Sequence, residues 1–209
     1  RSHRVLVDAR LISAVSHSPR TVVTVAMLAT VATVYPGFLI AALSVQVSAE
    51  FEVTEATYGW GLGSFFLAAT VASAPAGRLA QRLGPRRQMA GALLASAVAQ
   101  WALAMVARSF VAVLVCLVLA GLVNAAMQTA VNLSISSAQL SRLGLAVSLK
   151  QSAMPTASLI SGLAVPVFAL TIGWRWAFGV GAAWTLLVAL LVWRNLDDPV
   201  QTMVQRNRS

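Results

Sequence analysis

The stretch WRWAFGVGAAWTLLVALLVW, residues 174–193, decides the fold of this chain. It carries one charge, Arg175, which stands next to its first residue. From Trp174 to Trp193 a helix rises about 28 Å at about 1.5 Å per residue, close to the roughly 30 Å of a bilayer's hydrocarbon core. Tryptophan is enriched at membrane–water interfaces, and one stands at each end of this stretch. The stretch therefore predicts a transmembrane helix.

The rest of the chain repeats this apolar pattern. Hydrophobic residues make up 58% of the 209 residues and charged residues only 10%, whereas soluble domains carry roughly 25% charged residues. A spanning helix needs about 20 mostly apolar residues. Six stretches meet this requirement: about 21–47, 58–77, 88–107, 110–133, 143–170 and 174–193. We therefore expect an all-α membrane protein with six transmembrane helices.

The arginines between these stretches predict the orientation. Most of them fall before the first stretch, in the second and fourth gaps, or after the sixth stretch, all on one side of a six-helix arrangement. The other side holds Arg108 and Arg175 beside Glu50, Glu52 and Glu55. The positive-inside rule then places both termini in the cytoplasm, in a cell (plasma) membrane.

This orientation gives a simple domain organisation. We interpret residues 1–20 as a cytoplasmic leader and residues 21–193 as one transmembrane domain. Residues 194–209 are polar and basic. They are a cytoplasmic tail or the start of a linker.

The composition argues against several other classes of protein. The net charge of +9 can indicate nucleic-acid binding, but such proteins gather their basic residues on one face of a folded domain. Cys116 lies inside an apolar stretch, and neither His3 nor His17 has a partner at metal-ligand spacing. The predicted spans hold no carboxylate or histidine for acid–base chemistry. We therefore expect no nucleic acid, no metal, no cofactor and no enzymatic activity.

The gap between the second and third stretches carries the most specific motif, GRLAQRLGPRR at residues 77–87. It resembles the cytoplasmic signature loop of the major facilitator superfamily. That loop runs Gly, any residue, Leu, Ala, Asp, Arg, any residue, Gly, Arg, then Arg or Lys. The corresponding positions here are Gly77, Leu79, Gln81, Arg82, Gly84, Arg86 and Arg87.

The motif has a physical logic and some departures. We expect Gly77 to end the second helix, Gly84 to let the chain reverse, and the arginines to hold the loop at the anionic inner surface. Gln81 stands where the family has Asp, and Pro85 follows the second glycine. On the fourth stretch, Leu117 stands where the family tends to place an Arg four residues before a glycine. The resemblance therefore does not support proton coupling through that Arg.

A second resemblance lies at GWRWAF, residues 173–178, at the predicted outer start of the sixth helix. The superfamily commonly has a Gly-Trp-Arg-Trp-x-Phe segment at this place. We interpret it as an interfacial aromatic belt in which Arg175 reaches a lipid phosphate.

The resemblance implies a secondary transporter. In this family two six-helix halves, each made of two three-helix inverted repeats, enclose a substrate site near the midplane of the membrane. The chain would be the N-terminal half, with its first, second, fourth and fifth helices lining the cavity. It would move a small solute by alternating access together with a second six-helix half or a second copy of the chain. The alternative is a truncated remnant or a six-helix assembly partner that does not transport.

Polar residues inside the stretches are the candidate pathway residues. Asn124, Gln128 and Asn132 recur every four residues and so share one helix face. They either hydrogen-bond to neighbouring helices or line a wet cavity. Tyr35, in the first stretch, either lines the wall of the cavity or packs in the core of the helix bundle.

Lys150 and Gln151 interrupt the fifth stretch. Lys150 lies about seven residues, or roughly 10 Å, from the cytoplasmic end of that stretch. An ionisable residue at such depth indicates a functional site, and contact with substrate would favour an anionic or polar solute. The alternative is a lysine whose long side chain extends to the inner headgroups.

Overall fold

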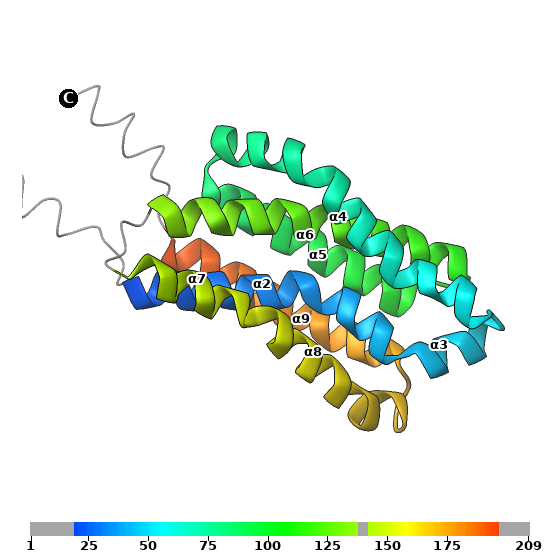
Figure 1. Cartoon of the computed structure of the whole chain (residues 1–209). Coiled ribbons are helices and arrows are strands. Elements are labelled where there is room, and N and C mark those ends of the chain that lie inside the picture. The colour runs from blue at the N-terminus through cyan, green and yellow to red at the C-terminus, as the bar shows by residue number, and fades with distance from the viewer. Residues whose placement is uncertain (1–18, 138–141, 197–209) are drawn as a thin grey trace, which may run out of the picture.

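The computed structural model describes residues 19–137 and 142–196, and the elements in these residues are all helices. The first four are α2 (Pro19–Ala42), α3 (Ser44–Phe51), α4 (Glu55–Leu83) and α5 (Pro85–Met105). They are followed by α6 (Phe110–Ser137), α7 (Leu143–Gln151), α8 (Ala153–Ala164), the π-helical turn η1 (Val165–Ala169) and α9 (Arg175–Asn195). Figure 1 shows them as one elongated bundle.

Five helical stretches in the described residues are long and apolar enough to cross a membrane. They are Arg20–Ala42, Pro85–Met105, Phe110–Ser137, Leu143–Ala169 and Arg175–Asn195. The prediction of an all-helical fold is confirmed for the residues that the structure describes. Helix α4, which contains the predicted second span, is not among the five, because its glycines and hydroxyl side chains dilute its apolar residues.

The helices form two layers (Figure 1). In the front layer α4, α6, α2 and the α7–α8 pair lie side by side in that order, whereas α5 and α9 pack against each other behind α6 and α2. The front layer thus holds the four helices that the family resemblance assigns to the cavity wall. The back layer holds the predicted third and sixth spans.

Small residues set the distances between these helices. Gly121 of α6 meets α4 so closely that a Cβ atom at this position would overlap the carbonyl oxygen of Phe65. Helix α8 turns buried small residues toward the bundle at Ala153, Ala157 and Ser161, and α2 is its main packing partner. Such residues let helix backbones approach in lipid, where the hydrophobic effect gives no drive for association.

The signature motif, which joins α4 to α5, contains two glycines for which the sequence predicted a role, Gly77 and Gly84. Helix α4 continues past Gly77 to Leu83, so the prediction that Gly77 ends the helix is wrong. A Cβ atom at Gly77 would meet nothing within 4 Å, so no close approach requires a glycine there. The chain does reverse at Gly84, whose φ of 83° suits glycine. Pro85 then begins α5, where its missing N–H costs no helical hydrogen bond.

The fifth predicted span is one apolar stretch but not one straight helix. Helix α7 ends at Gln151 and α8 begins at Ala153. Pro155 lacks the N–H that would bond to the carbonyl of Gln151, which accounts for an interruption here. The Ser152 hydroxyl at the break donates to the Leu149 carbonyl at 2.6 Å.

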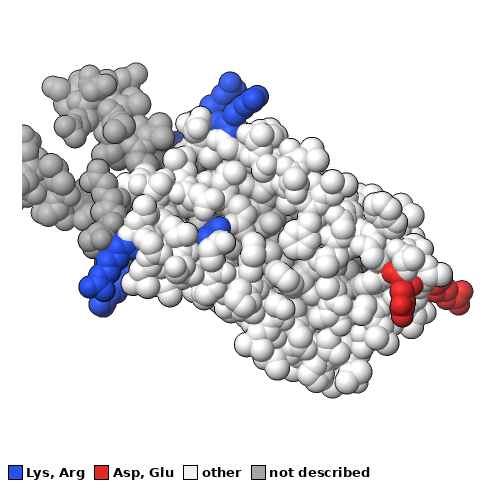
Figure 2. Space-filling view, viewed as in Figure 1, with Lys and Arg blue, Asp and Glu red and all other residues white. Residues whose placement is uncertain are grey.

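Charged side chains gather at the two ends of the bundle. Figure 2 shows basic side chains at one end, acidic side chains at the other, and an almost uncharged surface between them. Helix α2 begins and α9 ends at the basic end (Figure 1). This separation of charge follows the pattern from which the sequence predicted the orientation.

Candidate functional site

The most unusual polar group in the bundle is built around Lys150. Its side chain is buried between α7 and α6, and the residue is only 6% exposed. The ammonium Nζ donates to Oε1 of Gln128 at 2.5 Å and to Oε1 of Gln151 at 3.2 Å. We refer to Lys150, Gln128 and Gln151 as the lysine cluster.

The positions of two helices create the lysine cluster. Lys150 stands seven residues after Leu143, the first residue of α7, or roughly 10 Å along the helix axis. Helix α7 packs against both α2 and α6. Because an ammonium can only donate, it fixes the oxygen of Gln128 toward itself and turns the Gln128 amide nitrogen away. That nitrogen is buried and has no hydrogen-bond partner.

The charge of Lys150 is not balanced by any acidic residue that the structure describes. The described glutamates, Glu50, Glu52 and Glu55, lie at the opposite end of the bundle. The partners of Lys150 are neutral carboxamides, which solvate the ammonium but do not cancel its charge. A buried charge in this state attracts an anion, because the low local dielectric weakens screening.

The three carboxamides of α6 do not share one environment. Asn124 is buried, and its Oδ1 accepts a hydrogen bond from the Thr33 hydroxyl of α2 at 3.4 Å. Gln128 belongs to the lysine cluster, and Asn132 is exposed. Asn124 and Gln128 therefore link neighbouring helices, while Asn132 makes no such link that the structure shows.

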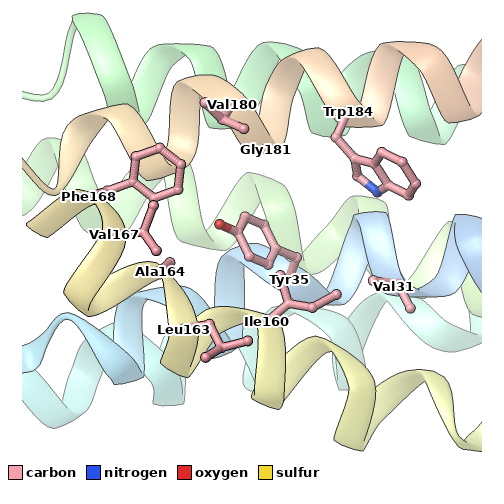
Figure 3. Close-up of a pocket in the computed structure, with 10 residues that line it drawn as sticks. All are labelled: Val31, Tyr35, Ile160, Leu163, Ala164, Val167, Phe168, Val180, Gly181 and Trp184. Atoms are coloured by element: carbon pink, nitrogen blue, oxygen red, sulfur yellow. The ribbon is translucent and has the colours of Figure 1, made fainter.

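Tyr35 points away from the lysine cluster. Its hydroxyl donates to the Ala177 carbonyl of α9, in the back layer, at 3.3 Å. Its ring lines an apolar pocket between α2, α8 and α9 (Figure 3). The structure thus brings Lys150, Gln128 and Gln151 together and leaves Tyr35 outside that group.

Two glutamines of α5 are polar core residues that the sequence analysis did not single out. Gln100 is fully buried, and its Nε2 donates to Thr185 Oγ1 of α9 at 2.9 Å and to the Ala32 carbonyl of α2 at 3.5 Å. In a regular helix the N–H of residue 36 would bond to the Ala32 carbonyl, but Pro36 has no N–H. The Gln100 amide supplies a hydrogen bond to that carbonyl instead. Polar residues inside an otherwise apolar stretch were the signal that could have found it.

Gln88 occupies a similar position near the basic end. Its Nε2 donates to the Ala126 carbonyl at 2.8 Å and to Thr129 Oγ1 at 3.1 Å, both on α6, and to the Ala76 carbonyl of α4 at 3.1 Å. It therefore joins three helices directly after the signature loop.

The signature loop is attached to α9 through Arg86. Its guanidinium donates to the Trp193 carbonyl at 2.6 Å and lies 4.5 Å from the centre of the Trp193 ring. Gln81 and Arg82 are exposed. The buried Leu117 stands where the family tends to have an Arg, and its Cδ1 lies 3.6 Å from where a Cβ atom of Gly61 would be. An apolar contact between α4 and α6 thus replaces the charge network.

Comparison with known proteins agrees with this geometry. The family model for the Major Facilitator Superfamily matches residues 21–208. This chain belongs to that superfamily. A search of curated proteins found no match. Membership of the major facilitator superfamily implies an integral membrane protein that takes part in moving small solutes across the membrane, and members of this superfamily are generally not enzymes.

The second motif of this superfamily member, at residues 173–178, anchors a network at the acidic end. Arg175 Nη1 lies 2.6 Å from Glu50 Oε1 at the end of α3, and its Nη2 donates to the Ala107 carbonyl at 2.9 Å. Trp174 Nε1 donates to Glu50 Oε2 at 2.6 Å. In this structure Arg175 therefore pairs with a carboxylate 125 positions earlier in the sequence, rather than with the lipid phosphate that the sequence suggested.

The electrostatics of Glu50 reflect this network. Partial burial raises the pKa of its carboxyl, but the hydrogen bonds from Arg175 and Trp174 and the nearby charges of Arg175 and Arg108 outweigh that effect. The pKa of Glu50 therefore lies below its ordinary value. Glu50 is held as a carboxylate, and through Arg175 it ties together the ends of α3, α5 and α9 at the acidic end of the bundle.

Proposed function

We propose that this chain is the N-terminal half of a secondary transporter that moves a small solute by alternating access. Family membership supports transport of small solutes in general. The two-layer arrangement supports a pathway along the front layer, because that layer holds α2, α4, α6 and the α7–α8 pair. The chain would act with a second six-helix half or a second copy of itself.

The proposal includes six membrane crossings, with α4 as the second. The 29 residues of α4 are more than enough to span the hydrocarbon core. Its glycines and hydroxyl groups suit a helix that faces a wet pathway rather than lipid. Both termini would lie in the cytoplasm, in the plasma membrane, and the two halves of the bundle would be inverted repeats of three helices.

The observation that carries the substrate class is the lysine cluster. Lys150 is buried in a predicted membrane span with only carboxamide oxygens as its observed partners. An anionic solute would supply the missing negative charge, and it would replace Gln128 or Gln151 as the acceptor. We therefore propose an anion as substrate, with Lys150 as its charge partner.

The other candidate residues would have supporting roles. Gln128 and Gln151 would hold the ammonium between substrate encounters. Asn124 would fix α2 against α6 through Thr33, which keeps the wall beside the cluster rigid. Asn132 and Tyr35 would contact the pathway only if the helices rearrange during transport, because neither touches the lysine cluster in this structure.

The test is uptake of labelled anions into vesicles that contain the complete transporter, with Lys150→Ala and Lys150→Arg compared. We expect Lys150→Ala to abolish uptake without loss of protein from the membrane and Lys150→Arg to keep part of it. Leu149→Ala is the matched control, since the neighbouring Leu149 is exposed. Normal uptake by the Lys150→Ala variant would refute the role of Lys150.

A further inference from the structure

An apolar pocket of about 380 Å³ lies between α2, α8, η1 and α9, apart from the lysine cluster. Its volume falls within the roughly 300–1,000 Å³ of small-molecule sites. Figure 3 shows the Tyr35 ring at its centre, with Phe168 and Trp184 on opposite sides. Tyr35 and Trp184 are the lining residues in Figure 3 that carry a polar side-chain atom, and the Tyr35 hydroxyl is already bonded to the Ala177 carbonyl.

The pocket has a buried floor and an exposed rim. Tyr35, Val31 and Ala164 form the floor, and Tyr35 is only 8% exposed. Leu163, Val180 and other rim residues are exposed and apolar. Gly181 completes the floor, because a Cβ atom there would lie 2.6 Å from the Tyr35 ring.

The position of the pocket identifies what surrounds it. The pocket lies where α8, a member of the outermost helix pair of the front layer, faces α9 of the back layer, so its exposed rim is at the edge of the bundle. Val180 and Trp184 lie four and eight residues after Trp176, or roughly 6 and 12 Å deeper along the helix. In the orientation proposed above, on which this step rests, that depth corresponds to the hydrocarbon of the outer half of a bilayer about 30 Å thick.

A helical irregularity accounts for the space. The π-helical turn Val165–Ala169 follows α8 directly and includes Pro166, and Val167 and Phe168 of this turn line the pocket. π-Helical turns occur frequently at functional sites. Helices α8 and α9 make at most minor contact with each other in the described residues, and the pocket lies in the gap between them.

We propose that this pocket binds one acyl chain of a membrane lipid from the outer leaflet. The rim is continuous with the apolar surface that α8 and α9 present to the bilayer, so lipid chains already surround its entrance. The lining carries no charge that a headgroup would require. The bound chain packs against the Tyr35 ring and fills the space that α8 and α9 leave between them.

Photocrosslinking tests the proposal, because Tyr35 lines the pocket and is otherwise almost fully buried. The full chain is reconstituted in phosphatidylethanolamine–phosphatidylglycerol vesicles that contain a phosphatidylethanolamine with a diazirine near the middle of one acyl chain. After irradiation, lipid adducts are mapped to residues by mass spectrometry. We expect a Tyr35 adduct in the wild-type protein and a loss of at least five-fold in Val180→Trp, whose indole covers the entrance.

Leu186→Trp is the matched control, since Val180 and Leu186 are both on α9 and both 49% exposed, but Leu186 does not line the pocket. We expect it to keep the Tyr35 adduct. Absence of the adduct in the wild type, or equal adducts in the two variants, would overturn the proposal. Labelling of Tyr35 by a free apolar diazirine such as adamantyl diazirine, but not by the lipid, would assign the pocket to a free apolar solute and would also overturn it.

Discussion

Among the described glycines, Gly121 is the position where one added methyl group should destabilise the fold most. In Gly121→Ala the new Cβ would overlap the Phe65 carbonyl oxygen, and it would lie 3.0 Å from the Phe65 carbonyl carbon and 3.1 Å from the Ala68 Cβ. The first two atoms belong to the backbone of α4, so no side-chain rotation relieves the overlap. Helices α4 and α6 must instead move apart along their seam.

The magnitude follows from comparison with a glycine that has free space. Gly91, in α5, has nothing within 4 Å of its ideal Cβ position. Replacing glycine by alanine inside a helix raises the free energy of unfolding by about 0.5–1 kcal/mol, because alanine loses less conformational freedom on folding. Both variants gain this amount, so it cancels when they are compared. Overpacking typically costs about 1–3 kcal/mol. We expect Gly121→Ala to be less stable than Gly91→Ala by about that amount.

The assay is unfolding of the purified variants in mixed micelles with increasing SDS, followed by circular dichroism. The free energy of unfolding of Gly91→Ala should equal or slightly exceed that of the wild type, whereas Gly121→Ala should unfold at a lower SDS fraction. Equal stabilities of the two variants would show that α4 and α6 do not approach as closely as the structure indicates.

Further predictions concern the acidic end and the core. The pKa of Glu50 is lower in the folded protein than its ordinary value, so its network contributes stability above about pH 4.3 that is lost as the pH falls through the folded pKa. The melting temperature of the wild type should therefore fall more steeply in acid than that of Glu50→Gln, and parallel pH profiles would contradict this. For Gln100 and Thr185, whose hydrogen bond joins α5 to α9, a double-mutant cycle with Gln100→Leu and Thr185→Val should give a coupling near 0.6 kcal/mol and below about 1.7 kcal/mol. A coupling of zero would show that this bond is not formed in the membrane.

The sequence predicted those features that depend on local composition. Apolar stretches gave the helical membrane class, and the arginines between them separated the two ends of the bundle. Gly84 marked the reversal between α4 and α5, because positive φ is a local property of the backbone. The end of α4 was missed at Gly77, since a glycine in free space neither stops nor bends a helix.

Features that depend on tertiary packing were not accessible from the sequence in the same way. The four-residue spacing placed Asn124 and Asn132 on one stripe, but only neighbouring helices decide that one is buried and the other exposed. The direction of Tyr35 depends on Gly181, which comes from another helix. The pairing of Glu50 with Arg175 joins residues 125 positions apart, and no local pattern connects them.

The neutral partners of Lys150 have a consequence for the energetics of a transport cycle. When an empty carrier switches its binding site from one side of the membrane to the other, the site would carry one uncompensated positive charge. When the carrier holds a monovalent anion, the site would carry no net charge during the same step. Moving one charge through the full potential changes the free energy by about 2.3 kcal/mol per 100 mV. The membrane potential would therefore change the rate at which the empty carrier returns and would have almost no effect on the loaded step. Exchange of one solute molecule for another uses only the loaded step, so its rate would not depend on voltage.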